Sequence, residues 1–181
     1  MTREELILYA TPTGPLAAEC ERYFDAATDL GPTVAQDFPP HCTLTGFFRR
    51  TPTRAVELVV EAASVLDGLG STPPPVVEVV ALRATPDWVG LELRSPWLRA
   101  VTDGLVARDR PGPGDDPLRP KTWLHLSLAY GPEDLSSHAE LARTTFSARA
   151  AAGWQVGLWQ RRDDGSWVDR SGPSRPPPAE A

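Results

Sequence analysis

The chain has 181 residues, of which 41% are hydrophobic and 23% charged, a composition typical of a globular protein with a substantial buried core. Its formal net charge of −6 weighs against a protein that coats long nucleic acids, because such proteins usually carry a basic face. No segment is apolar over the length that a membrane-spanning helix needs, and the first ten residues lack the pattern of a signal peptide. Cys20 and Cys42 form no disulfide or metal motif, so we expect a cytoplasmic protein.

The first half of the chain alternates between predicted strands and helices. A short apolar run predicts a strand at 6–10, and apolar residues at helical spacing predict a helix at 16–30. After the Pro39-Pro40 turn, a strand is expected at 41–48, followed by a helix at 56–66. Residues 76–82 and 88–94 predict a hairpin.

The second half repeats a similar order. Ser95 and Pro96 predict the start of a helix that runs to 108. A strand at about 123–130, a helix at 134–145 and a hairpin of 153–162 with 165–171 follow. This repeated order is weak evidence for an internal duplication. We expect one domain over 1–170 and a disordered, proline-rich tail at 171–181.

Two segments share one short pattern. His41-Cys42-Thr43-Leu44 and His125-Leu126-Ser127-Leu128 both place a hydroxyl two residues after a histidine, 84 positions apart in a chain with three histidines. Because side chains i and i+2 of a strand point to the same face, each histidine should project together with its hydroxyl. The leucines of the second motif then form the opposite, core-facing row, which also includes Tyr130.

Two imidazoles and two hydroxyls suit in-line displacement at phosphorus without a metal. An imidazole titrates near neutral pH, so one ring can accept a proton while the other donates one. Attack of water on a cyclic phosphodiester needs both steps, and the Thr43 and Ser127 hydroxyls can donate to the non-bridging oxygens.

The two motifs resemble the paired His-x-Thr/Ser motifs of the 2H phosphoesterase superfamily. "PHCTLTG" and "WLHLSLAYG" are most similar to its cyclic phosphodiesterase branch, in a superfamily that also contains the 2'-5' RNA ligases. The resemblance implies an α+β, bilobal, internally duplicated fold, in which two antiparallel sheets face a central cleft and helices lie outside. It also implies that His41 and His125 are catalytic, that Thr43 and Ser127 bind phosphate, and that no metal or other cofactor is required. By resemblance alone, His125 is favoured as the base and His41 as the acid.

The sequence therefore predicts a monomeric enzyme that hydrolyses 2',3'-cyclic or related cyclic phosphates on nucleotides or short RNA 3' ends. A non-catalytic module that binds nucleotides or RNA ends, and a 2'-5' RNA ligase, are the alternatives. A zinc site built from His41, His125 and Cys42 is disfavoured, because Cys42 should point away from His41.

The remaining candidates are weighed by position. His138 is expected on a helix surface, and Tyr130 either packs in the core or reaches the cleft edge to contact substrate. The aromatic residues beside the motifs are expected in the core, although they could stack on a base; these are Phe47, Phe48 and Trp123. Basic residues near the motifs either attract phosphate or are solvated loop charges; these are Arg49, Arg50, Arg54, Arg119 and Lys121.

Overall fold

The computed structural model of the protein describes residues 3–31, 33–69, 77–131, 134–147, 153–162 and 164–170. Within these ranges the fold is α+β, as the sequence predicts, with four α-helices and one antiparallel sheet of eight strands. The first half contains β1 (Glu4–Thr13), α1 (Pro15–Ala27), β2 (Cys42–Thr43), β3 (Phe48–Arg50) and α2 (Pro52–Leu69). The rest contains β4 (Glu78–Thr85), β5 (Trp88–Arg94), α3 (Pro96–Arg108), β6 (Leu124–Tyr130), α4 (Leu135–Thr145), β7 (Gly153–Arg161) and β8 (Trp167–Asp169).

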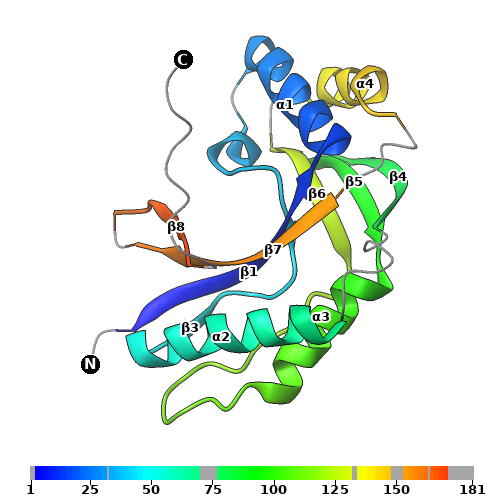
Figure 1. The fold of residues 1–181 in the computed structure, drawn as a ribbon. Coiled ribbons are helices and arrows are strands. Elements are labelled where there is room, and N and C mark those ends of the chain that lie inside the picture. Colours follow the sequence, from blue (N-terminus) through cyan, green and yellow to red (C-terminus); the bar gives the residue numbers. More distant parts are fainter. Residues whose placement is uncertain are drawn as a thin grey trace, which may run out of the picture.

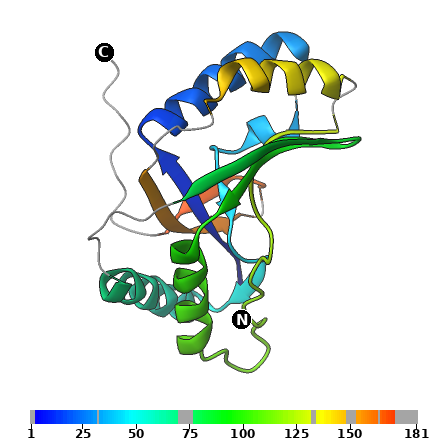
Figure 2. The ribbon, with the colours of Figure 1, turned by 90° about the vertical axis from the view of Figure 1, so that its right-hand side faces the viewer.

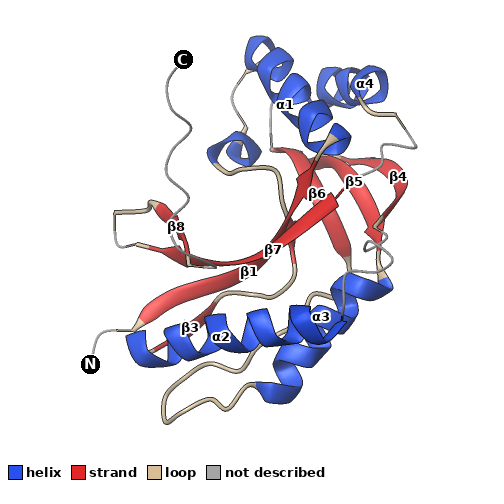
Figure 3. Cartoon of the chain, in the orientation of Figure 1, coloured by secondary structure: helices blue, strands red, loops and turns tan. Residues whose placement is uncertain are grey.

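The strands are hydrogen-bonded in the order β4-β5-β6-β2-β1-β7-β8, and β3 pairs with the start of β1 (Figure 3). The family resemblance implies two sheets, whereas these strands form one continuous sheet. Its two sides meet at β2, which pairs with β1 through Ala10↔Cys42 and with β6 through Cys42↔Leu126. The sheet is continuous because this one short strand is shared, and the predicted duplication of the two halves stays a prediction.

The predicted strand at 41–48 is broken into β2 and β3. After Leu44 donates its backbone N–H to Leu8 O at 2.9 Å, the chain leaves β1 and pairs with another loop, where Gly46 N donates to Arg119 O at 2.9 Å. The hydroxyl of Thr45 accepts the N–H of Leu8 at 3.1 Å. A side chain thus replaces a strand partner, so the buried donor of Leu8 stays satisfied while the chain detours. Thr45 is therefore buried and does not continue the His41 face.

The helices form two pairs at opposite ends of the molecule. Figures 1 and 2 show α1 beside α4 at one end and α2 beside α3 at the other. All four helices contribute to a single apolar cluster, which also holds the alternate residues Leu6, Leu8 and Ala10 of β1. The alternate residues of β6 face the same cluster; these are Leu124, Leu126 and Leu128. The opposite faces of β1, β2 and β6 are left for other contacts.

Local sequence signals account for several boundaries. Both predicted hairpins are confirmed as the antiparallel pairs β4–β5 and β7–β8. Ser95 begins α3 by accepting the Leu98 N–H on its hydroxyl at 3.1 Å, which is the predicted cap. No helix in the described part of the chain has the length and apolar character to cross a membrane. The predicted tail at 171–181 lies outside the described residues.

Candidate active site

The two histidine motifs lie on neighbouring strands. Because β2 and β6 are antiparallel with Cys42 opposite Leu126, the register places His41 across from Ser127 and Thr43 across from His125. All four of these side chains line one cavity of about 90 Å³. Cys42, between His41 and Thr43, is fully buried in the apolar cluster on the other face. The structure thus brings together the four residues that the sequence singles out.

The cavity is small and has a mixed lining. Tyr9 and Tyr130 contribute hydroxyl-bearing rings. The segment before β2, which includes a 3-10 helix at Val34–Asp37, closes one side with Val34, Ala35, Phe38, Pro39 and Pro40. Cavities for whole drug-sized ligands usually hold about 300–1,000 Å³. At about 90 Å³, this cavity has room for a compact group such as a phosphoryl group, and a larger ligand would extend out of it.

The ring of His41 is held in one orientation. Its Nδ1 lies 2.8 Å from the carbonyl oxygen of Pro39. A carbonyl can only accept, so Nδ1 carries the proton in the neutral ring and Nε2 carries the lone pair. Tyr9 packs against the same ring with 3.9 Å between centroids, and Phe38 meets it edge-on at 6.0 Å. The free lone pair is therefore on a fixed atom of a fixed ring.

His125 is oriented by the same device. Its Nδ1 lies 3.4 Å from the carbonyl oxygen of Trp123, which is also the residue two positions earlier in the chain. Trp123 stacks on the imidazole with 4.2 Å between centroids, and Trp88 meets it edge-on at 5.3 Å. Both histidines thus use Nδ1 for a backbone contact, which leaves Nε2 of each ring for chemistry.

Burial lowers the pKa of both histidines. For His41, the positive charge that His125 can carry lowers the pKa further, while the Pro39 carbonyl opposes the shift. For His125, the backbone carbonyl of Trp123 also opposes the effect of burial, and the charge of Lys121 adds to the lowering. Both rings are therefore neutral at neutral pH in the free protein, and a proton on one disfavours a proton on the other.

The hydroxyl of Ser127 already has two partners. Its Oγ accepts the indole N–H of Trp88 at 3.0 Å and donates to Tyr130 Oη at 2.6 Å. Ser127 is thus held beside His125 on the same face of β6, as the alternation of a strand requires.

Tyr130 lies on the face opposite to the one that simple alternation gives it. The pairing shifts between Val89↔Ala129 and Gly90↔Ser127, so β6 contains one extra residue, Leu128. Such a bulge moves each later side chain to the other face. Leu128 and Ala129 are both buried, and Tyr130 is 42% exposed and lines the cavity with Ser127. Tyr130 therefore does not pack in the core but lies at the edge of the cavity, and its contact with substrate stays a prediction.

Several residues of the cavity surroundings were not predicted. Tyr9, Phe38 and Trp88 come from separate parts of the chain, and only the tertiary pairing of strands shows that they meet the histidines. Phe48 is buried in the core as expected, whereas Trp123 is 45% exposed. Phe47 is also partly exposed and stacks on Trp167 with 5.8 Å between centroids.

His138 is not a surface residue. It is fully buried between α4 and α1, where its Nδ1 lies 2.9 Å from Tyr23 Oη. His138 lies on the buried face of α4, which packs against α1, together with Ala139 and Ala142. It does not line the histidine cavity.

The basic residues after the first motif have structural contacts. Arg50 is buried and donates to Asp109 Oδ2 at 2.6 Å and to the Arg49 carbonyl at 2.9 Å. Arg54 pairs with Glu57. The side chain of Arg119, before the second motif, donates to the Phe47 carbonyl at 2.9 Å. None of these arginines lines the histidine cavity, and Lys121 acts there only through its charge on His125.

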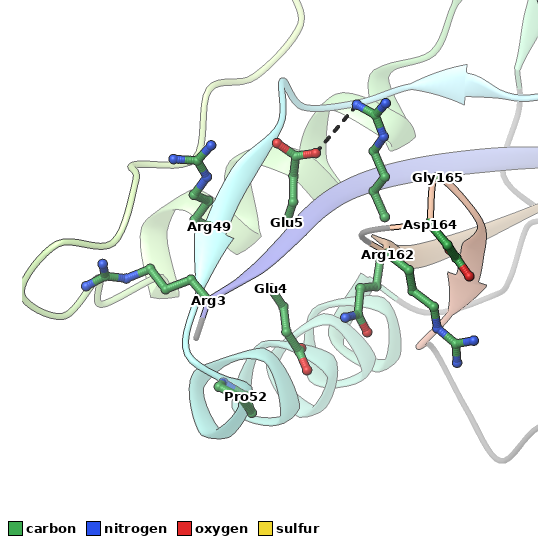
Figure 4. A pocket seen from close by; sticks show the side chains of 10 residues that line it. Arg3, Glu4, Glu5, Arg49, Pro52, Arg162, Asp164 and Gly165 are labelled. Carbon is green, nitrogen blue, oxygen red and sulfur yellow. Dashed lines mark ion pairs between the residues drawn. The ribbon is translucent and has the colours of Figure 1, made fainter. Parts of the chain in front are cut away.

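A larger hollow of about 850 Å³ lies elsewhere, at the start of β1 and the end of β7 (Figure 4). Its lining mixes both signs of charge. Glu5 pairs with Arg161 at 3.7 Å, and Glu4 pairs with Arg170 at 3.6 Å. It contains no histidine or cysteine among its lining residues, so its chemistry is that of a solvated charged surface.

Within the described residues, no three or more His, Cys, Asp or Glu side chains gather in a group that could hold a metal. The disfavoured zinc set fails on geometry, because Cys42 is buried on the face opposite to His41 and His125.

Comparison with known proteins gives a distant likeness. No family model matches the chain. Among curated proteins, the chain is similar to the ecdysteroid-phosphate phosphatase of Bombyx mori, with 25% identity over 163 residues. The match covers 87% of this chain and 24% of that protein, so the chain spans about a quarter of the relative's length.

Proposed function

We propose that this protein hydrolyses phosphoesters, and that its substrates are 2',3'-cyclic or closely related cyclic phosphodiesters on nucleotides or short RNA ends. One observation carries the proposal: two histidines, each with Nδ1 on a backbone carbonyl, line one small cavity together with two hydroxyls. The likeness to a protein named as a phosphatase supports the general reaction class. The cyclic diester follows from the chemistry of the two rings and from the resemblance to the 2H phosphoesterases.

The reaction needs one neutral and one protonated imidazole. Nε2 of the neutral ring takes a proton from water as the water oxygen bonds to phosphorus. The bond from phosphorus to one ribose oxygen breaks on the opposite side, and Nε2 of the protonated ring gives that oxygen its proton. The assignment of His125 as base and His41 as acid, and of Thr43 and Ser127 as donors to the non-bridging oxygens, belongs to this proposal.

The lowered pKa values fit such a cycle. In the free protein, burial lowers the pKa of both rings, and the charges of His125 and Lys121 lower the pKa of His41 and of His125 further, respectively. A bound phosphate adds a negative charge, which favours the charged form of a nearby imidazole. The substrate thus brings about the protonation that creates the general acid, so the active form requires the ligand.

The test compares hydrolysis of 2',3'-cyclic AMP with hydrolysis of p-nitrophenyl phosphate, a monoester, in the presence of EDTA. The proposal predicts turnover of the cyclic diester and little of the monoester, because a monoester without strain gains less from a two-histidine acid–base pair. Preference for the monoester would point to the chemistry named for the relative. Joining of RNA ends would support the ligase, and binding of AMP without turnover of any ester would support a binding module.

A further inference from the structure

Trp88, the first residue of β5, is buried beside the candidate site. Its indole N–H donates to Ser127 Oγ at 3.0 Å, and its ring stands at 89° to the imidazole of His125. Trp88 therefore contacts both predicted site residues of the second motif, His125 and Ser127, although it does not line the cavity itself.

The contact with Ser127 has a fixed direction. An indole N–H can donate a hydrogen bond and cannot accept one, so Ser127 must present a lone pair to Trp88. The serine proton then points away from Trp88, and it is donated to Tyr130 Oη at 2.6 Å. In this chain of hydrogen bonds from Trp88 to Ser127 to Tyr130, the Tyr130 hydroxyl proton is the last one, and Tyr130 lines the cavity. Hydrogen bonds arranged in series polarise one another, which makes the last proton a better donor.

Gly90 makes room for this arrangement. A Cβ at Gly90 would lie 2.3 Å from Cζ2 of Trp88 and 2.4 Å from the Leu126 carbonyl oxygen. Only a residue without a side chain lets the indole lie across β5 so that Nε1 reaches Ser127 on β6. Gly90 also stands at the bulge that moves Tyr130 to the cavity face.

We propose that Trp88 is a positioning residue that occupies one lone pair of Ser127 Oγ and keeps the serine proton turned toward Tyr130 and the cavity, and so favours anionic oxygens on this side of the cavity. This inference rests on the proposed function. When a phosphate oxygen enters, the Ser127 proton can turn from Tyr130 to the stronger, charged acceptor while Trp88 still holds Oγ in place. Tyr130, released as an acceptor, keeps its own proton for the ligand.

The kinetic test is a double-mutant cycle of Trp88→Phe with Ser127→Ala, assayed on 2',3'-cyclic AMP. Trp88→Phe keeps an aromatic ring and removes the N–H, so kcat/KM should fall about tenfold, the size of one hydrogen bond. In the Ser127→Ala background the same substitution should change kcat/KM less than about twofold, because the two act as one unit. An equal loss in both backgrounds would show that Trp88 acts through packing alone and would overturn the inference.

Trp154→Phe is the matched control. Trp154 is as buried as Trp88, at 7% and 6% exposure, but its Nε1 has no hydrogen-bond partner among the described residues and it does not line the cavity. This substitution should leave kcat/KM unchanged. A loss equal to that of Trp88→Phe would mean that any buried tryptophan matters, and it would overturn the assignment to Trp88.

Two further measurements separate this inference from the proposed function. In ¹⁵N–¹H spectra, Ser127→Ala should move the Trp88 indole resonance and leave that of Trp154 in place; an unmoved Trp88 resonance would refute the hydrogen bond. If the wild type does not hydrolyse cyclic nucleotides, the proposed function fails. The role of Trp88 is then tested by measuring the binding of inorganic phosphate. Weaker phosphate binding by Trp88→Phe than by the wild type and Trp154→Phe supports it, and equal binding overturns it.

Discussion

Gly90→Ala changes the site by a single methyl group. The new Cβ would lie 2.3 Å from the Trp88 ring and 2.4 Å from the Leu126 carbonyl oxygen. An ordinary contact between carbon and a carbonyl oxygen is about 3.3 Å or more, so relief needs a movement of about 1 Å. The indole can rotate, but the carbonyl belongs to the backbone of β6 and is paired with β5 through Leu91↔Leu126. The methyl group must therefore separate the two strands.

Overpacking of this kind costs about 1–3 kcal/mol, and we expect the upper part of that range because a backbone atom must move. Trp88 would also leave Ser127, so kcat/KM for a cyclic diester should fall by about tenfold or more from the lost hydrogen bond. Urea denaturation measures the first effect, and initial rates at a temperature well below the unfolding transition measure the second.

Gly68→Ala is the matched control for this prediction. Gly68 lies in α2, and a Cβ there would meet nothing within 4 Å. The same change should therefore raise the free energy of unfolding, by about 0.5–1 kcal/mol, because alanine loses less backbone entropy in a helix. If Gly90→Ala were as stable as Gly68→Ala, or if it kept full activity, the close packing of Trp88 over Gly90 would be refuted.

Three other changes test separate parts of the structure. Burial lowers the pKa of His138, so the folded chain takes up its proton less readily than the unfolded chain; the stability is full above about pH 6.5 and falls as the pH drops below it. His138→Gln should flatten that part of the curve in urea titrations at pH 7.5 and 5.5, and an unchanged slope would contradict this role. Arg50→Met should lower the free energy of unfolding by about 3–5 kcal/mol because Asp109 loses a buried partner. Adding Asp109→Leu should restore part of this loss, since the Arg49 and Asp116 carbonyls still lack the Arg50 donor; a double variant no better than the single one would refute the ion pair as the cause. Tyr130→Phe should lower kcat/KM about tenfold through the loss of one hydrogen-bond donor. The free energy of unfolding should stay within about 0.5 kcal/mol of the wild-type value, because the ring is partly exposed. Full activity of this variant would show that the Tyr130 hydroxyl does not act on the substrate.

Much of the fold could be predicted because its signals are local. The apolar run of β1, the Ser95 cap of α3 and the two hairpins each depend on neighbouring residues. The broken strand at 41–48 could not be predicted, because the break depends on Thr45 replacing a backbone partner of Leu8. That contact joins residues 37 positions apart.

In the candidate site, too, some residues could be predicted from local sequence and others depend on tertiary pairing. The alternation of side chains in a strand was enough to place His125 with Ser127, and the two motifs did meet in one cavity. The sequence leaves the face of Tyr130 open because the bulge at Leu128 comes from the pairing of β6 with β5, which the sequence of β6 alone does not encode. Tyr9 and Trp88 carry no local signal for a site, since each looks like a residue of an ordinary strand.

The central claim is that His41 and His125 together perform acid–base catalysis on a cyclic phosphodiester. The most direct test is the initial rate of 2',3'-cyclic AMP hydrolysis in EDTA for the wild type, His41→Ala, His125→Ala and the double variant, each checked for folding by circular dichroism. Each single substitution should lower kcat by about 10²–10⁴-fold. The double variant should fall by less than the product of the two losses, because the two rings act in one step. A folded single variant that keeps its rate within a few-fold of the wild type would contradict the two-histidine mechanism.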